Sequence, residues 1–200
     1  METYLSIGKK NLSYENFNPI NKNLTFKPNG GLWATLHNTK YKTYNAWLDF
    51  ISSNRHILFY KYIKSNDYNI PAVLFTLKDN AKILHINDEN DLNNLMNKYF
   101  INNYIDYKTL SKDFDGIYLC INNLLRTIND NNLKKELADF DVDSLILFNL
   151  DCIAYYQEAI VTIATYDYEI NHECIEYEIK IKEEQKQIED ISSLTRKRPE

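Results

Sequence analysis

Residues Glu158–Ile170 read EAIVTIATYDYEI, and this stretch carries the clearest secondary-structure signal in the chain. It is rich in β-branched residues and tyrosine, which favour a pleated and half-buried conformation. The short apolar run at its start is typical of a buried strand. We therefore expect a strand here that is headed by Glu158.

Short β-prone runs occur before and after this stretch, separated by polar breaks rather than by regular helices. The expected strands are residues 3–7, 56–63, 71–77, 81–86, 115–121, 143–150 and 174–181, with 32–35 a brief strand or turn. Apolar residues at helical spacing predict helices at 43–53, 87–100 and 131–140, the second of them capped by Asp88 or Asn90. Strands dispersed among a few helices predict an α+β fold.

The composition bounds the class of protein. The chain has 200 residues, 44% of them hydrophobic, and a formal net charge of -5. This length suits one domain, which we expect over residues 1–182, followed by a charged helical tail over 183–200. The acidic balance argues against non-specific binding to a phosphate backbone. No apolar run reaches the length of a membrane span and no signal-peptide pattern opens the chain, so we expect no membrane partner and a cytoplasmic location.

Common catalytic and metal-binding motifs are absent from the sequence. It contains no GxGxxG, GxxxxGK[ST], HExxH or GxSxG pattern. The three cysteines form no CxxC pair, which favours buried, reduced thiols. The four histidines have no metal-ligand spacing, and His37 is kept as a candidate only because it closely follows a tryptophan-containing stretch.

Residues 30–35 read GGLWAT and place two of the chain's four glycines directly before Trp33. Glycine lets another group approach the backbone where a Cβ would clash. An aromatic face can hold a flat cation by stacking and cation–π attraction. A turn followed by a core tryptophan at Trp33 explains the same residues, and Trp47 can likewise be a core residue. Both interpretations stay open.

Glu158 follows Tyr-Tyr-Gln and precedes an apolar strand. A carboxylate at the mouth of a buried strand can be fixed by packing and still face a cleft, as electrostatic catalysis requires. An exposed glutamate at the edge of a strand is the alternative. Glu176 and Glu178 form a competing pair, because residues two apart on a strand face the same side.

Three segments carry a resemblance to a known family. GGLWAT with the helix after it resembles the second motif of ADP-ribosyltransferases, and YYQEAIVTI is similar to their third motif, in which a catalytic Glu opens a strand. DSLILFNLDCI resembles the strand and turn that precede that Glu. The resemblance implies a split antiparallel β-sandwich core with peripheral helices. It also implies a mono-ADP-ribosyltransferase of toxin or effector character that cleaves NAD and modifies a macromolecular acceptor, either protein or nucleic acid.

The resemblance also implies roles for individual residues. Glu158 is the implied catalytic residue, stabilising the oxocarbenium-like centre that forms as nicotinamide leaves, and Gln157 is implied to orient the acceptor. The residues implied to bind NAD are Ser6, Gly8, Gly31, Leu32, Trp33, Thr35 and Trp47. In the first motif Ile7 stands where the family has His or Arg, unless Ser6 takes that role. The alternative is a non-catalytic α+β interaction protein in which Glu158 is a surface residue and the aromatics are core.

Overall fold

The computed structural model describes residues 2–20, 24–25, 27–37, 47–48, 50, 69–102, 104–138, 140–164 and 176–188. The strand expected at 56–63 and the tail residues 189–200 lie outside the described residues. The same holds for most of the helix expected at 43–53, although Trp47, Leu48 and Phe50 are described and helical.

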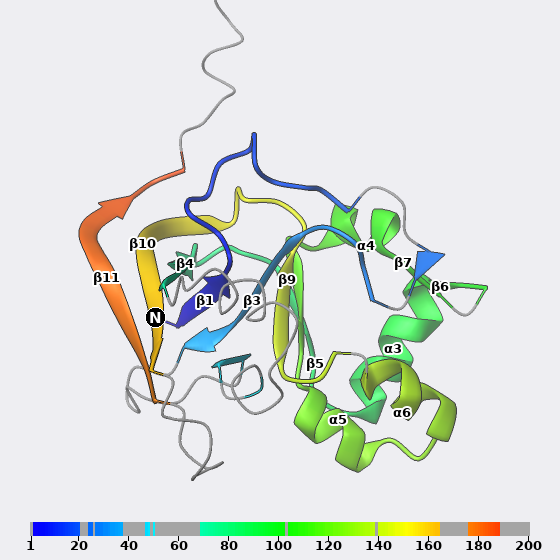
Figure 1. Ribbon diagram of the computed structural model, residues 1–200. Coiled ribbons are helices and arrows are strands. Elements are labelled where there is room, and N and C mark those ends of the chain that lie inside the picture. Colours follow the sequence, from blue (N-terminus) through cyan, green and yellow to red (C-terminus); the bar gives the residue numbers. More distant parts are fainter. Residues whose placement is uncertain are drawn as a thin grey trace, which may run out of the picture.

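A large mixed sheet forms the centre of the fold (Figure 1). Its eight strands lie in the order β11 (Glu176–Lys186), β10 (Ile153–Ala164), β4 (Asn69–Leu77), β1 (Thr3–Ile7), β3 (Leu32–His37), β9 (Ser144–Leu147), β8 (Gly116–Leu119) and β5 (Ile83–Ile86). Neighbouring strands are antiparallel except β5 and β8, which are parallel. The α+β class expected from the sequence is confirmed.

The helices and a small second sheet gather near β9, β8 and β5, away from β10 and β11 (Figure 1). They are α3 (Glu89–Tyr99), α4 (Tyr107–Asp113), α5 (Ile121–Thr127) and α6 (Asn131–Ala138), with the small sheet ordered β2 (Leu24–Thr25), β7 (Tyr104–Asp106) and β6 (Phe100–Ile101). Asp88 caps α3 by accepting from the backbone N–H groups of Asn90 and Asp91. The sequence named Asp88 as one of two possible caps. It did not predict α4 or α5, each of which spans only seven residues.

Alternation along the strands gives the large sheet two faces, because directly paired residues point the same way and successive residues point oppositely. The Tyr4 face carries Tyr4, Ser6, Val73, Phe75, Tyr156 and Glu158. The Leu5 face carries Leu5, Thr35, Leu74, Gln157 and Ala159.

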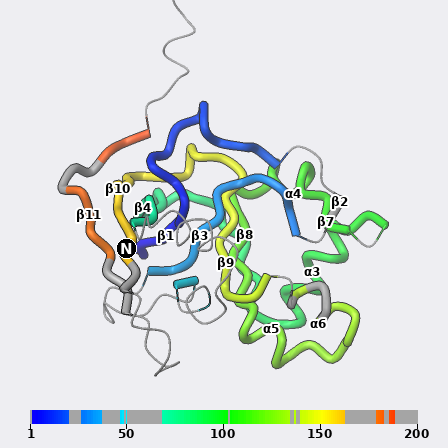
Figure 2. The backbone as a smooth tube through the Cα atoms, in the orientation of Figure 1, coloured from blue at the N-terminus to red at the C-terminus, as the bar shows by residue number. Residues whose placement is uncertain are grey.

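Different segments cover the two faces. Leu12, Tyr14 and Phe17, from the segment after β1, pack with the hydrophobic residues of the Tyr4 face. Figure 2 traces this segment, in dark blue, from β1 past the connection between β9 and β10. On the Leu5 face, Trp47 and Leu48 pack over β1, β4 and β10, while the helices pack against β9, β8 and β5.

Several predicted boundaries are wrong. The strand expected at 143–150 ends at Leu147, and two larger differences lie at the β10–β11 pair. β10 begins at Ile153 rather than at Glu158, because the preceding residues also pair with β4. β11 continues to Lys186, so residues 183–186 are strand rather than helical tail. Pairing of Lys186 with Tyr156 stabilises the extended backbone there, which local helix preference cannot outweigh. Within the described ranges, no helix has the length and apolar character needed to cross a membrane.

Candidate functional site

Glu158 lies within β10, as the sixth of its twelve residues, and forms an ion cluster with β11. Its two carboxylate oxygens accept from Lys182 Nζ at 2.9 Å and from Lys186 Nζ at 2.5 Å. The Glu158 side chain is 18% exposed, whereas the lysines are 60% and 41% exposed. The predicted place at the mouth of a strand is therefore wrong. A carboxylate in mid-strand beside the edge strand is held there by the two ammonium groups.

The ion cluster fixes the charge state of Glu158. Hydrogen bonds from Lys186 and then Lys182 hold the pKa of the carboxyl below its usual range, outweighing the opposite effect of burial. A general acid near neutral pH needs a raised pKa. Glu158 is therefore an anion at neutral pH, with its charge balanced by its own strand neighbours.

Trp33 does not lie near Glu158. Thr35 points to the Leu5 face, so Trp33, two residues earlier on β3, points there too, whereas Glu158 is on the Tyr4 face. Three strand spacings separate β10 from β3, which is about 14 Å at roughly 4.8 Å per spacing. The sheet itself stands between the two side chains, and they do not line one cleft.

Trp33 instead anchors the helical side of the core. Its ring stacks on Phe140 with centroids 5.9 Å apart, and its indole N–H donates to the carbonyl of Gly30 at 2.9 Å. Lys27 Nζ lies 5.6 Å from each of the two ring centroids. These are the contacts of a core residue, which is one of the two interpretations that the sequence left open for Trp33.

The paired glycines give clearance to the protein's own backbone. Gly30 and Gly31 have φ angles of +104° and +76°, which side chains other than glycine rarely adopt. A Cβ on Gly30 would lie 2.8 Å from the carbonyl oxygen of Asn18, and one on Gly31 would lie 2.9 Å from that of Leu147. The expectation that the glycines leave room for a ligand is therefore wrong, because the chain itself fills that room.

The other candidates divide between the two faces. Ser6 lies on the Tyr4 face in the same cross-strand row as Glu158, with Val73 between them, but it is only 2% exposed. Gln157 and Thr35 lie on the Leu5 face, and Thr35 is 1% exposed. The structure therefore brings Ser6 to the face of Glu158 and leaves Gln157 and Thr35 on the other.

Three further candidates have structural roles. Leu32 is buried in the hydrophobic cluster of the Tyr4 face. Trp47 packs over the Leu5 face, and its indole N–H donates to Ser144 Oγ at 3.4 Å. Gly8 has a φ of +84° and donates its N–H to the carbonyl of Pro71 at 2.7 Å, which joins the residue after β1 to β4. The competing residues Glu176 and Glu178 are in the backbone of β11, and their side chains lie outside the described part.

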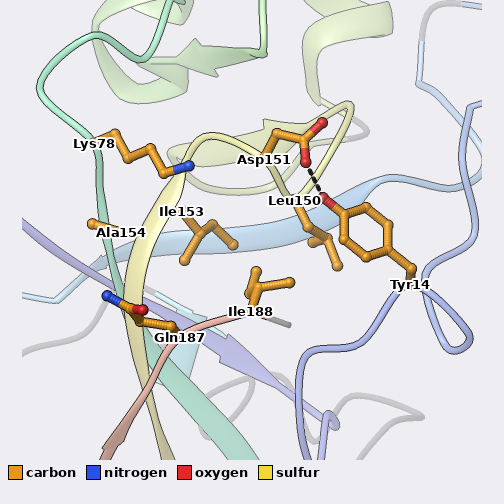
Figure 3. Close-up of a pocket in the computed structure, with 8 residues that line it drawn as sticks. All are labelled: Tyr14, Lys78, Leu150, Asp151, Ile153, Ala154, Gln187 and Ile188. Atoms are coloured by element: carbon orange, nitrogen blue, oxygen red, sulfur yellow. Dashed lines mark hydrogen bonds between the residues drawn. The ribbon is translucent and has the colours of Figure 1, made fainter. Parts of the chain in front are cut away.

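A pocket of about 260 Å³ opens beside the ion cluster. Four segments line it: the N-terminal segment (Tyr14), the residue after β4 (Lys78), the turn before β10 with the first residues of β10 (Leu150, Asp151, Ile153, Ala154), and the residues after β11 (Gln187, Ile188). We call it the Lys78–Asp151 pocket. Figure 3 shows the ammonium, carboxylate and amide groups around a floor of Leu150, Ile153 and Ile188. Small-molecule sites combine apolar lining with a few polar groups; this pocket has both, although polar groups make up the larger part of its exposed lining.

The Lys78–Asp151 pocket was not predicted from the sequence. Its lining residues come from four segments spread between Tyr14 and Ile188, and the sequence does not show that these meet. The one signal in the sequence is the stretch LDCI at residues 150–153, which the family resemblance includes only as part of a strand and turn. Tyr14 donates to Asp151 Oδ1 across this gap in sequence, which joins two walls of the pocket.

His37, Cys120 and Cys152 add no reactive site among the described residues. The ring of His37 has a buried Nδ1 with no hydrogen-bond partner in the described part of the chain, and burial lowers the pKa of the imidazole. Burial raises the pKa of the Cys120 thiol, and it raises that of Cys152 to about 12, which disfavours the reactive thiolate. Among the described His, Cys, Asp and Glu side chains, no group of three or more is placed to hold a metal ion.

Comparison of the chain with protein-family models, with curated proteins and with solved structures finds no match in any of the three. The geometry of the pocket and of the ion cluster is therefore what bears on function.

Proposed function

We propose that the protein is a non-catalytic α+β binding protein that takes a small polar molecule in the Lys78–Asp151 pocket. The observation that carries this proposal is the pocket itself, where an ammonium, a carboxylate and an amide surround an aliphatic floor. Such a lining can orient a ligand by its polar atoms and hold it by apolar contact. No nucleophile and base are needed for this role.

The arrangement around Glu158 supports a role without catalysis. A catalytic carboxylate has to direct its charge at the reacting atoms. Here both oxygens of Glu158 accept hydrogen bonds from lysines of β11, and the candidate stacking residue Trp33 lies on the other face of the sheet. The ion cluster is therefore assigned to holding β11 against β10.

A pocket-filling substitution tests the binding function. Ala154→Phe places a ring in the Lys78–Asp151 pocket, while Tyr155→Phe alters the neighbouring residue, which is 43% exposed and on the opposite face. We expect a panel of small metabolites to include at least one that shifts amide resonances of pocket residues in wild type and Tyr155→Phe. The same compound should produce no shifts in Ala154→Phe.

Two results would contradict the proposal. One is a panel in which no compound perturbs the pocket resonances of the wild-type protein. The other is a compound whose perturbations persist in Ala154→Phe while its folded spectrum is intact, because binding would then lie elsewhere.

A second candidate is a mono-ADP-ribosyltransferase that uses NAD and modifies a protein or nucleic acid. It is supported by the shared row of Glu158 and Ser6 on the Tyr4 face. It is also supported by β3, which pairs with β1 through residues 35–37 and with β9 through 32–34. This change of partner along β3 is where a sheet of the split type would divide. The 2% exposure of Ser6 means that NAD would have to displace the side chains packed over it.

Release of nicotinamide distinguishes the two candidates. Wild type and Glu158→Gln are incubated with NAD, with and without cell lysate as a source of acceptors. The binding-protein proposal expects no release above buffer from either variant. Release by wild type that drops at least a hundredfold in Glu158→Gln would establish the transferase candidate instead, since loss of electrostatic stabilisation at the transition state has about that effect.

A further inference from the structure

We propose that the ligand of the Lys78–Asp151 pocket is a small zwitterion, with one ammonium, one carboxylate and a short aliphatic group, as in a free aliphatic α-amino acid. This inference rests on the proposed binding function and names the chemical class of its ligand.

The pocket holds two side chains of opposite charge. Lys78 and Asp151 both line it, yet among the ion pairs of the described residues none joins Lys78 to Asp151. Two oppositely charged side chains that line one pocket without forming an ion pair with each other can each bind a charged group of a ligand. A ligand with one charge of each sign uses both, its carboxylate on Lys78 and its ammonium on Asp151.

The Asp151 carboxylate is held in place for this role. Tyr14 donates its hydroxyl hydrogen to Oδ1, and the backbone N–H of Asp151 donates to Asn149 Oδ1 at 2.9 Å. The first contact orients the carboxylate and the second fixes the turn that carries it. A carboxylate has about four acceptor positions, so a ligand ammonium can bind Asp151 without breaking the contact with Tyr14.

The floor and the size limit the rest of the ligand. Leu150, Ile153 and Ile188 offer only aliphatic surface between the polar groups (Figure 3). The volume of about 260 Å³ lies below the roughly 300–1,000 Å³ of pockets that enclose drug-sized ligands. This favours a molecule of about the size of one amino acid. The amide of Gln187 can donate to its carboxylate or accept from its ammonium.

The expected selectivity is moderate because the two charged groups are exposed. A molecule that lacks one charge leaves Lys78 or Asp151 in water, which costs little in an open site. Each missing charge should therefore weaken binding about tenfold, in line with one charge-assisted hydrogen bond.

Three probes that share a branched aliphatic group test the inference by calorimetry and by chemical-shift titration. They are L-leucine, 4-methylpentanoate, which lacks the amine, and 3-methylbutylamine, which lacks the carboxylate. We expect wild type to bind L-leucine about tenfold more tightly than either analogue.

Two charge variants assign the contacts. Lys78→Met should weaken L-leucine and 4-methylpentanoate about tenfold and leave 3-methylbutylamine unchanged. Asp151→Asn, which retains an acceptor for Tyr14, should weaken L-leucine and 3-methylbutylamine and leave 4-methylpentanoate unchanged. Asp79→Asn is the matched control, because Asp79 is exposed next to Lys78 but does not line the pocket, and it should bind all three as wild type does.

The outcomes separate this inference from the proposed function. If L-leucine binds no more tightly than its analogues, or binds unchanged in both charge variants, the zwitterion assignment is wrong. If the metabolite panel perturbs the pocket through a compound that is no zwitterion while L-leucine does not bind, the binding function stands and this inference falls. If nothing perturbs the pocket, both fall.

Discussion

The ion cluster at Glu158 and the Lys78–Asp151 pocket lie along the same edge of the sheet and use the same kinds of side chain, yet they differ in whether the charges meet. Glu158 accepts from two lysines at 2.9 and 2.5 Å, whereas Lys78 and Asp151 face one pocket and form no ion pair with each other among the described residues. In the cluster the opposite charges pair with each other and hold β10 and β11 together. In the pocket the two charges are not paired with each other, and this difference, rather than residue type, is why we propose the ligand site there and not at the cluster.

Tyr156 separates the two sites, and its removal should have the largest effect. It is 7% exposed and packs in the Tyr4-face cluster, so Tyr156→Ala opens a cavity in that cluster. We expect a loss of about 3 kcal/mol in the free energy of unfolding, by analogy with other large aromatic truncations. Urea denaturation measures it.

The neighbouring residue supplies the control for this prediction. Tyr155 is 43% exposed and points to the other face, so Tyr155→Ala should cost less than about 1 kcal/mol. Equal losses for the two variants would mean that the Tyr4 face does not support the two sites through Tyr156.

The cluster should show measurable coupling of intermediate size. In a double-mutant cycle, Glu158→Gln and Lys186→Met should couple by about 1 kcal/mol, while Glu158→Gln and Lys182→Met should couple by about 0.5 kcal/mol. Lys186 is closer to the carboxylate and less exposed than Lys182, which is the reason for the order. A coupling near zero for both lysines would place the cluster in the same class as the pocket and remove the contrast.

The smallest effect concerns pH. The two lysines lower the pKa of Glu158 in the folded protein, so the cluster stabilises the fold fully above the unfolded-state pKa of about 4.3. The contribution is lost as the pH falls through the lower, folded-state pKa. The difference in free energy of unfolding between wild type and Glu158→Gln should therefore shrink between pH 6 and pH 3.

Two other carboxylates do not disturb this measurement. The pKa values of Asp106 and Asp113 are also lowered, by hydrogen bonds from Thr109 and from Tyr99, but both residues are present in both variants and cancel in the difference. A difference that stays constant or grows on acidification would contradict the assignment of the cluster.

The sequence predicted secondary structure best where the pattern is local. The strand at 3–7, the strand at 71–77 and the helix capped at Asp88 were found because alternation, apolar runs and capping are properties of neighbouring residues. The boundaries of β10 and β11 were missed because strand pairing, which extends both, joins residues distant in sequence. The prediction that Glu158 and Trp33 share one site is wrong for the same reason. Periodicity shows that both residues belong to strands, but only strand order and register show that they lie on opposite faces of the sheet.

By itself, the sequence determined the α+β class and the core character of its apolar strands. These follow from propensity and period along the chain. Only the tertiary structure shows which groups lie where a Cβ on Gly30 or Gly31 would be. They are the carbonyl oxygens of Asn18 and Leu147. The tertiary structure also decided that Glu158 is ion-paired with two lysines of β11 and that Tyr14, Lys78, Asp151 and Gln187 line one pocket. The physical reason is that a charge acquires its role from what lies within a few ångströms of it, and chain folding sets those neighbours.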